Sequence, residues 1–440
     1  MSAHWTSEPA GPISGRLRVP GDKSISHRAL LLGAIARGRT EIDGFLPGQD
    51  CLATLAAVRA LGVRVEQPSG DRVLVDGVGL QGLQPPAGPL DMGNSGTAIR
   101  LLAGLLAGQR FDSVLTGDES LRRRPMERLA EPLRLMGAVI DTRAGCAPLT
   151  IHGGRRLHGI DYRLPVASAQ VKSAILLAGL YASGETRVRE PAVTRDHTER
   201  MLLQFGAPLA RSDRSAGIRG GGELSAAEVQ VPGDFSSAAF FLLAATVTPG
   251  SDLLIERVGL NPTRTGLLEI LRRMGADIET ETLPAPPGGE PVGNLRVRHA
   301  RLRGIDVPAA LVPLAIDEFP VVFVAAALAD GVTTIRGAEE LRHKESDRIA
   351  VVLRGLRALG VAAEERPDGA VIRGGRLAAG RVDSAGDHRV AMAFAAASAV
   401  AGGPLEIADT ANVATSFPNF LDLASAAGLR LAAAASAVDD

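Results

Sequence analysis

The stretch Val19-Pro20-Gly21-Asp22-Lys23-Ser24-Ile25-Ser26-His27-Arg28 opens an apolar segment that ends at Gly38. A Pro-Gly turn followed by Asp22 or Ser24 as N-cap predicts a loop that leads into a buried helix. Lys23, Ser24 and Arg28 would then lie at the N-terminal end of that helix, where unpaired backbone N–H groups and the helix dipole favour anions. The stretch therefore predicts a phosphate or carboxylate site. The alternative is an ordinary capped helix with exposed charges.

The opening motif returns 212 residues later as Val231-Pro232-Gly233-Asp234-Phe235-Ser236, with Phe235 in the place of Lys23. Six helical patterns along the chain also end in an apolar residue and a glycine, which can take the left-handed backbone conformation. These glycines are 68 to 85 residues apart: Gly62, Gly137, Gly206, Gly275, Gly360 and Gly428. The regular spacing indicates six copies of one unit, divided into two sets of three.

These repeats predict an α/β fold with two similar domains, each made of three repeated α/β units. Residues 21–232 would form the first domain, and residues 1–20 with 233–440 would form the second. Segments 236–246 and 321–329 are apolar on nearly every face, which predicts interior helices ringed by sheet. Segment 211–222 shows no periodic pattern, so we expect a surface loop there.

The composition excludes some partners. The chain has 440 residues, 45% of them hydrophobic, and a formal net charge of −1. This balance gives no general electrostatic reason to bind nucleic acid or an anionic membrane. The first residues show no signal-peptide pattern, so we expect a cytoplasmic protein.

Lysine is rare in this chain. The 48 basic residues include only three lysines: Lys23, Lys172 and Lys344. A lysine that remains in an arginine-rich chain suggests a site that needs a compact ammonium group. We expect this of Lys23 and Lys344, and chance to explain Lys172.

Further polar clusters stand where buried helices are predicted to begin. They are Gly93-Asn94-Ser95-Gly96-Thr97, Arg122-Arg123-Arg124-Pro125, Ser168-Ala169-Gln170, Asp317-Glu318, Leu341-Arg342-His343-Lys344-Glu345-Ser346-Asp347-Arg348 and Asp387-His388-Arg389. Each has a structural alternative: the acids could cap a helix, and the arginine run could be a solvated loop before a helix at 127–136. Lys344 and Arg348 are four residues apart, which predicts that both side chains lie on the same face of a helix. Together the clusters predict a cationic cleft between the domains, suited to small phosphorylated and carboxylated metabolites.

These motifs, in this order, resemble the 5-enolpyruvylshikimate-3-phosphate synthase family over essentially the whole chain after the first dozen residues. The resemblance implies the enolpyruvyl transferase fold and a role in the shikimate pathway of aromatic amino-acid biosynthesis. The implied reaction transfers the carboxyvinyl group of phosphoenolpyruvate to the 5-hydroxyl of shikimate 3-phosphate and releases phosphate, without metal or other cofactor. The form of Ser168-Ala169-Gln170, together with Arg195, is similar to the second bacterial class.

The resemblance also implies which residues act. Shikimate 3-phosphate would be bound by Lys23, Ser24, Arg28, Ser168, Ala169, Gln170, Arg195, Asp317 and Lys344. Phosphoenolpyruvate would be bound by Lys23, Gly96, Arg124, Gln170, Arg348 and Arg389. The implied catalytic residues are Asp317, which takes the hydroxyl proton, Glu345, which delivers a proton to the methylene carbon, and Lys23. We expect a monomer whose partners are these two small molecules and the inhibitor glyphosate.

Two positions depart from the family pattern: Thr415 stands where some members have a lysine, and Leu101 where many have a proline. One alternative function is enolpyruvyl transfer to a UDP-amino sugar, but that family typically has a loop cysteine at the position of Glu119. The other is a non-catalytic repeat protein that binds phosphate ligands. Such a protein would tolerate the loss of Asp317 and Glu345.

Overall fold

The computed structural model describes residues 3–285 and 289–434. Contacts divide the chain into two compact units, and each has its own apolar core. Unit 1 comprises Met1–Pro20, Pro232–Pro284 and Pro291–Asp440, and unit 2 comprises Gly21–Val231 and Ala285–Glu290.

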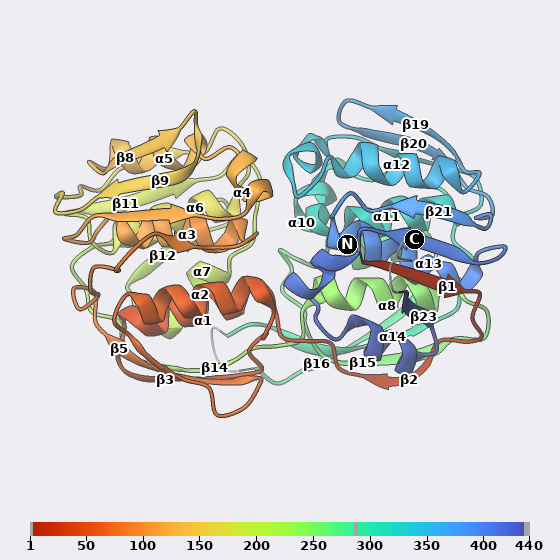
Figure 1. Cartoon of the computed structure of the whole chain (residues 1–440), viewed down its shortest axis with the longest axis horizontal. Coiled ribbons are helices and arrows are strands. Elements are labelled where there is room, and N and C mark those ends of the chain that lie inside the picture. The colour runs from red at the N-terminus through yellow and green to blue at the C-terminus, as the bar shows by residue number, and fades with distance from the viewer. Residues whose placement is uncertain (1–2, 286–288, 435–440) are drawn as a thin grey trace, which may run out of the picture. The chain divides into compact units, whose positions relative to one another are not determined.

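In the described part of unit 2, three buried helices each pack against their own four-stranded sheet (Figure 1). The helices are α1 (Lys23–Ile35), α3 (Gly96–Leu106) and α6 (Ala169–Gly179). The sheets have the strand orders β14-β3-β5-β4, β6-β7-β9-β8 and β10-β11-β13-β12. The strands are β3 (Arg37–Asp43), β4 (Arg64–Glu66), β5 (Arg72–Val78), β6 (Leu90–Asp91), β7 (Ser113–Thr116), β8 (Val139–Arg143), β9 (Cys146–His152), β10 (Asp161–Arg163), β11 (Glu185–Arg189), β12 (Leu209–Ser212), β13 (Ser215–Arg219) and β14 (Glu228–Gln230). Further helices connect the strands: α2 (Gln49–Ala60), α4 (Glu119–Arg123), α5 (Glu127–Leu135) and α7 (His197–Gln204).

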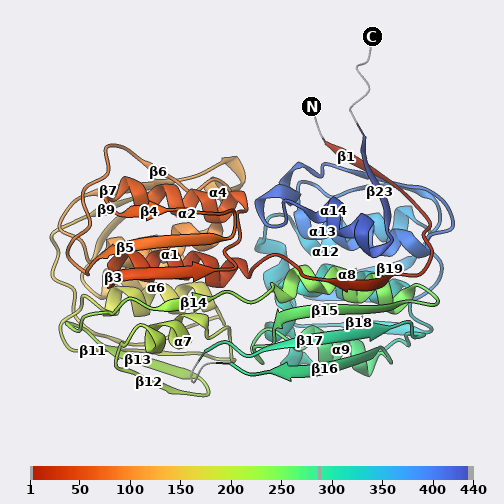
Figure 2. The ribbon, with the colours of Figure 1, turned by 90° about the horizontal axis from the view of Figure 1, so that it is seen from below.

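Unit 1 repeats this plan around α8 (Phe235–Val247), α11 (Phe319–Ala327) and α13 (His388–Ala397), which contact one another. Figure 2 shows α8 and α13 from below. Its described sheets have the orders β16-β17-β15-β2, β18-β20-β19 and β21-β22-β1-β23. The strands are β1 (His4–Glu8), β2 (Ser14–Leu17), β15 (Asp252–Gly259), β16 (Asp277–Leu283), β17 (Val292–Arg298), β18 (Val332–Ile335), β19 (Ala362–Arg366), β20 (Gly369–Arg373), β21 (Gly380–Asp383), β22 (Leu405–Ala408) and β23 (Arg430–Ala434). The other helices are α9 (Gly266–Arg273), α10 (Val312–Ala315), α12 (Arg348–Ala358) and α14 (Phe420–Ala427), with short 3₁₀ helices η1 (Ala309–Leu311), η2 (Ile316–Glu318), η3 (Glu339–His343), η4 (Ser398–Val400) and η5 (Ala411–Thr415).

The four-stranded sheets share one pairing pattern: one parallel pair at an edge, followed by two antiparallel pairs. In the first sheet of unit 2, Ile42 lies opposite Val229 in the parallel pair and opposite Val73 in the antiparallel pair. Where the other described sheets have a parallel edge strand, the three-stranded sheet has isolated parallel bridges, Asp306 to Thr334 in β18 and Arg303 to Asp330 just before β18. The repeated α/β unit that the glycine spacing predicted is therefore confirmed.

The six repeat glycines end the outer helices α2, α5, α7, α9, α12 and α14. Their φ angles lie between +83° and +109°, which confirms the predicted left-handed conformation. This conformation lets the chain leave each helix and enter the next strand.

Some predicted elements differ from the structure. Segment 211–222 is not a loop, because β12 and β13 form an antiparallel hairpin there. The interior helix expected at 321–329 spans Phe319–Ala327, since Pro320 is tolerated in the first helical turn. In the described chain, the continuous segment Ala309–Ala327 is long and apolar enough to cross a membrane, but 61% of it is buried inside the structure.

Candidate active site

The buried helices begin at polar side chains. Within the described chain, five of them have an N-cap side chain that accepts a hydrogen bond from a backbone N–H of the first turn: Asp22, Ser95, Ser168, Asp234 and Asp387. The predicted N-cap role of Asp22 is confirmed, with 3.0 Å between its Oδ1 and the nitrogen of Ile25. These caps keep the polar residues beside them at the helix ends, where anions are favoured.

At the start of α1, two candidate cations are held by residues from other helices. Lys23 Nζ lies 2.9 Å from Asp50 Oδ2. The buried Arg28 donates from Nε to Thr198 Oγ1 (2.6 Å), from Nη2 to Ser173 Oγ (2.9 Å) and from Nη1 to the carbonyl of Ser24 (2.8 Å). Burial lowers the pKa of Arg28 to about 10; the nearby Arg195 acts in the same direction, and carboxylates including Glu199 oppose it.

The starts of α3 and α6 are joined by Gln170. Its Oε1 accepts from Arg100 Nη1 at 2.8 Å, and its Nε2 donates to Thr97 Oγ1 at 3.0 Å. Gly96 leaves space for two guanidinium groups, because a Cβ there would lie 2.9 Å from Arg100 Nη1 and 3.0 Å from Arg124 Nη1. Three predicted residues, Gly96, Arg124 and Gln170, are thus brought into one group.

The arginine run is not the solvated loop that was its structural alternative. Arg122 and Arg123 are exposed on the short helix α4, and Arg124 is its C-cap. Arg124 is buried and donates from Nη2 to Asn94 Oδ1 at 2.6 Å. The helix after it begins at Glu127, so Pro125 precedes the helix rather than standing in its first turn.

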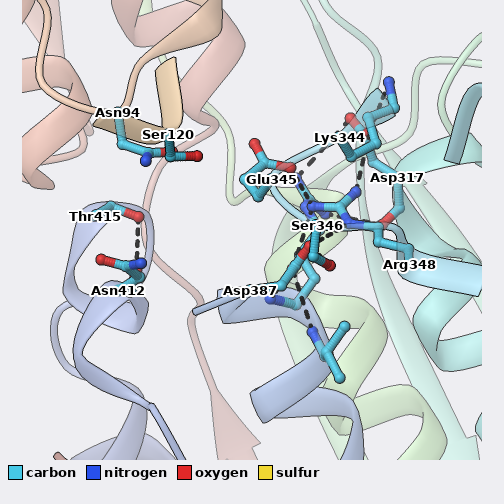
Figure 3. Close-up of polar contacts among 12 residues, drawn as sticks. Asn94, Ser120, Asp317, Lys344, Glu345, Ser346, Arg348, Asp387, Asn412 and Thr415 are labelled. Atoms are coloured by element: carbon cyan, nitrogen blue, oxygen red, sulfur yellow. Dashed lines mark hydrogen bonds and ion pairs between the residues drawn. The ribbon is translucent and has the colours of Figure 1, made fainter. Parts of the chain in front are cut away.

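In unit 1, cations surround the carboxylate of Asp317 (Figure 3). Lys344 Nζ and Arg348 Nη1 each lie 3.7 Å from Asp317 Oδ1, and Arg389 Nη2 lies 4.0 Å from Oδ2. Arg389 Nη1 also donates to the Asp317 carbonyl at 3.3 Å. The side chain of Asp317 remains partly exposed, so a ligand can reach it.

Arg348 links Asp317 to two further carboxylates. It donates from Nε to Asp387 Oδ2 (2.8 Å) and from Nη2 to Glu345 Oε2 (2.6 Å) (Figure 3). Burial alone would lower the pKa of Arg348, but the carboxylates of Asp387, Glu345 and Asp317 outweigh it and raise that pKa. The guanidinium is therefore charged at neutral pH.

Lys344 and Arg348 do not share a helical face. Lys344 is the C-cap of η3, and Asp347 starts a new helix by accepting a hydrogen bond from the Ala350 nitrogen. The two cations nevertheless meet at Asp317, because the chain changes direction between them.

Glu318 has a different role from its neighbour Asp317. It is buried, accepts a hydrogen bond from Ser236 Oγ and lies 3.6 Å from Arg389 Nη1 and 3.9 Å from Arg264 Nη2. Neither acid caps α11 with its side chain. Glu318 therefore links the starts of α8, α11 and α13, and Asp317 is the more accessible carboxylate.

The two departures from the family pattern have local roles. Thr415 donates from its hydroxyl to the Asn412 carbonyl at 2.6 Å, within η5 (Figure 3). Leu101 is fully buried on α3, one turn beyond Gly96.

Lys172 corrects a sequence-based expectation. It is not a chance survivor, since it is 1% exposed and its Nζ lies 2.8 Å from Glu190 Oε2 and 2.7 Å from Glu199 Oε1. Its partners are 18 and 27 residues away, so no local pattern identified them. Asp50, Arg100 and Arg264 were missed for the same reason.

The predicted site residues occur in both units. Unit 2 contains Lys23, Ser24, Arg28, Gly96, Arg124, Ser168, Ala169, Gln170 and Arg195, and unit 1 contains Asp317, Lys344, Glu345, Arg348 and Arg389. In the ranges 3–285 and 289–434, no group of three or more His, Cys, Asp or Glu side chains is arranged to hold a metal ion.

Solved structures identify the class of protein. An enolpyruvyl transferase from Streptomyces tendae superposes with a TM-score of 0.77 at 16% identity, over 99% of this chain and 100% of that one. The fold of repeated units around capped buried helices is thus the enolpyruvyl transferase fold. An EPSP synthase from Acinetobacter baumannii superposes with a TM-score of 0.88 at 50% identity, over 98% of this chain and 100% of that one.

The chain belongs to the EPSP synthase (3-phosphoshikimate 1-carboxyvinyltransferase) family, whose model matches residues 7–423. A 3-phosphoshikimate 1-carboxyvinyltransferase from Methylococcus capsulatus is 61% identical over 426 residues, covering 97% of each chain. One from Acidithiobacillus ferrooxidans is 63% identical over 428 residues, covering 97% of this chain and 98% of the other.

Proposed function

We propose that the charged groups described in units 1 and 2 carry out the reaction of this family. The chain is a transferase of aromatic amino-acid biosynthesis, and its two substrates are phosphoenolpyruvate and shikimate 3-phosphate. It transfers the carboxyvinyl group of phosphoenolpyruvate to the 5-hydroxyl of shikimate 3-phosphate, giving 5-enolpyruvylshikimate 3-phosphate and phosphate. The observation that carries the residue assignment is Asp317, a partly exposed carboxylate with three cations within 4.0 Å.

Shikimate 3-phosphate is bound mainly through its phosphate and hydroxyl groups. The buried Arg28, held by three hydrogen bonds, presents a fixed positive charge at the start of α1. The full set proposed for this substrate is Lys23, Ser24, Arg28, Ser168, Ala169, Gln170, Arg195, Asp317 and Lys344. Hydroxyl, amide and cationic groups are the types that bind a phosphorylated sugar acid.

Phosphoenolpyruvate is bound by cations suited to its carboxylate and phosphate. Arginine can bind either group through two parallel hydrogen bonds, and the space at Gly96 admits two guanidinium groups. The proposed set is Lys23, Gly96, Arg124, Gln170, Arg348 and Arg389. Thr415 contributes no charge, so these residues neutralise the substrate without a cation at position 415.

Asp317 and Glu345 move the protons. The 5-hydroxyl oxygen adds to C2 of phosphoenolpyruvate while Asp317 takes its proton, and Glu345 gives a proton to C3. The product of this addition is a tetrahedral intermediate. Glu345, now a carboxylate, then takes a proton from C3 as the C–O bond to phosphate breaks, which leaves the enol ether. The cations, including Lys23, stabilise the departing phosphate.

Three further properties are proposed with this function. Glyphosate, a small anion, inhibits the enzyme at the phosphoenolpyruvate site, the enzyme acts as a monomer, and it works in the cytoplasm. The net charge of −1 and the 61% burial of the apolar segment Ala309–Ala327 support action on small molecules rather than on nucleic acid or membranes.

Phosphate release tests the substrate assignment. Release should require both phosphoenolpyruvate and shikimate 3-phosphate, and a UDP-amino sugar should not replace the latter. Release with the UDP-amino sugar would support the sister reaction. Binding of both substrates without release would support a non-catalytic binding protein.

A further inference from the structure

Lys172 lies in a buried ionic cluster at the start of α6 that the proposed mechanism does not use. Its ammonium group lies 2.8 Å from Glu190, at the end of β11, and 2.7 Å from Glu199, on α7. The three side chains are 2% to 4% exposed. The cluster therefore ties together three elements that are consecutive in the third repeat of unit 2.

A buried ion pair is stable only when its geometry is good, because both charged groups have lost their hydration. Burial alone would lower the pKa of Lys172, but the carboxylates of Glu199 and Glu190 outweigh it and raise that pKa. The ammonium therefore stays charged and binds both carboxylates. A compact group with rotatable donors suits this geometry better than a planar guanidinium, which explains why a lysine is retained in an arginine-rich chain.

A second link, made of hydroxyl groups, lies directly beside the ionic one. Ser173 follows Lys172 on α6 and Thr198 precedes Glu199 on α7, and Thr198 Oγ1 donates to Ser173 Oγ at 2.7 Å. These same two hydroxyls accept hydrogen bonds from Nε and Nη2 of Arg28. Because Lys172 holds α7 against α6, it also fixes the pair of acceptors that orients the Arg28 guanidinium.

The cluster also holds the segment before Arg195. Thr194 donates from its hydroxyl to Oε1 of Glu190, and the other oxygen of Glu190 is bound by Lys172. Arg195 follows directly and lies close enough to Arg28 to affect its titration. Both arginines proposed to bind shikimate 3-phosphate are thus connected to the cluster: Arg28 through hydrogen bonds to neighbours of the cluster residues, and Arg195 through the adjacent Thr194.

We propose that Lys172 is a positioning residue for the reaction: through Glu190 and Glu199 it orients Arg28 and Arg195 toward shikimate 3-phosphate. The inference rests on the proposed function, because it assigns those two arginines to that substrate. It explains a buried cluster that neither the fold nor the chemistry otherwise requires.

Steady-state kinetics of the full-length enzyme test the proposal. Lys172→Met should raise KM for shikimate 3-phosphate about tenfold or more, since a small misplacement of binding groups has large effects, while KM for phosphoenolpyruvate stays within about twofold. Thr194→Val removes one hydrogen bond and keeps the ammonium, so it should raise the same KM about threefold. If Lys172→Met does not fold, the KM values of Thr194→Val test the proposal.

A control variant and a double-mutant cycle separate positioning from loss of stability. Val73→Ala, in the core of unit 2, should lower Tm and leave both KM values unchanged. Combining Lys172→Met with Glu199→Gln should have less effect than the product of the two single changes, because both act through one link. Equal rises in both KM values, or an unchanged KM for shikimate 3-phosphate, would overturn the proposal.

Arg28→Met distinguishes failure of the inference from failure of the proposed function. If it raises KM for shikimate 3-phosphate and Lys172→Met does not, the inference alone is wrong. If Arg28→Met has no effect on that KM, the substrate assignment is wrong and the inference falls with it.

Discussion

At the scale of single residues, Asp317 and Glu345 carry the proposed chemistry and are linked through Arg348. We predict that Asp317→Asn and Glu345→Gln each lower kcat by about 10²- to 10⁴-fold, as is typical of a lost general acid or base. Both changes keep the side-chain size, so the substrate Kd values should change much less. Phosphate release and equilibrium binding measure the two effects. Near-normal turnover in either variant would remove that residue from the catalytic role.

Gly96 is the second residue-scale test, because its missing side chain makes room for Arg100 and Arg124. In Gly96→Ala the methyl group would displace these guanidinium groups and narrow the proposed phosphoenolpyruvate site. We predict a higher KM for phosphoenolpyruvate and a still higher inhibition constant for glyphosate, since glyphosate is the longer molecule. The quantity to compare is the ratio of the two constants in wild type and variant. A ratio that does not rise would mean that Gly96 is not a steric gate.

His27 makes stability depend on pH. It is fully buried against Thr54 and Ser95, and burial, with Lys23 and Arg28, lowers its pKa well below 6.5. As the pH falls, the His27 imidazole therefore becomes protonated in the unfolded chain before it does in the folded protein. The free energy of unfolding thus decreases as the pH falls below 6.5, by up to about 1.4 kcal/mol per pH unit.

The variant His27→Gln should flatten the dependence of Tm on pH between 5 and 6.5. His152 gives the matched control, because Asp141 raises its pKa. Its contribution to stability is therefore fully present below pH 6.5 and is lost only at higher pH. His152→Gln should therefore not flatten the curve. An unchanged slope in His27→Gln would show that His27 does not cause the loss of stability in acid.

At the level of helices and strands, the repeat glycines allow a test of whether the outer helices end because these residues adopt the left-handed conformation. Gly206 has a φ of +83°, and a Cβ there would meet nothing within 4 Å. Gly206→Ala should therefore destabilise unit 2 only through backbone strain, by about 1–2 kcal/mol. Gly70→Ala is the matched control, since a Cβ at Gly70 would also meet nothing within 4 Å and Gly70 has no positive φ. Differential scanning calorimetry should show a lower Tm only for Gly206→Ala; equal Tm values would contradict the assignment.

The sequence predicted those elements whose causes are local. The Pro-Gly turn and Asp22 lie within three residues of the helix that they start, and the repeat glycines end theirs directly. The hairpin of β12 and β13 was missed because its strands are short and neither alternates: β12 is exposed over most of its length, and the three middle residues of β13 are all buried. The shared face of Lys344 and Arg348 was wrong because Asp347 restarts the helix between them.

At the scale of the whole molecule, the repeat count and the order of the motifs were enough to predict the fold class and the family. The pairing of the charges was not predictable, because Lys23 meets Asp50, and Lys172 meets Glu199, over 27 residues in each case. Such pairs depend on how helices pack, which local spacing does not reveal. Candidate substrate-binding residues occur in both units, so the proposed reaction belongs to the whole chain.

In the proposed reaction the 5-hydroxyl adds to phosphoenolpyruvate, with protonation at C3, and phosphate is then eliminated. The most direct test is to run the reaction in D₂O and measure deuterium in the vinyl methylene group of the product by NMR. Wild type should place deuterium there, because C3 becomes a methyl group in the intermediate and then loses one hydrogen; Glu345→Gln should slow this incorporation together with turnover. Product formed at the normal rate with no deuterium at that carbon would contradict this addition–elimination mechanism.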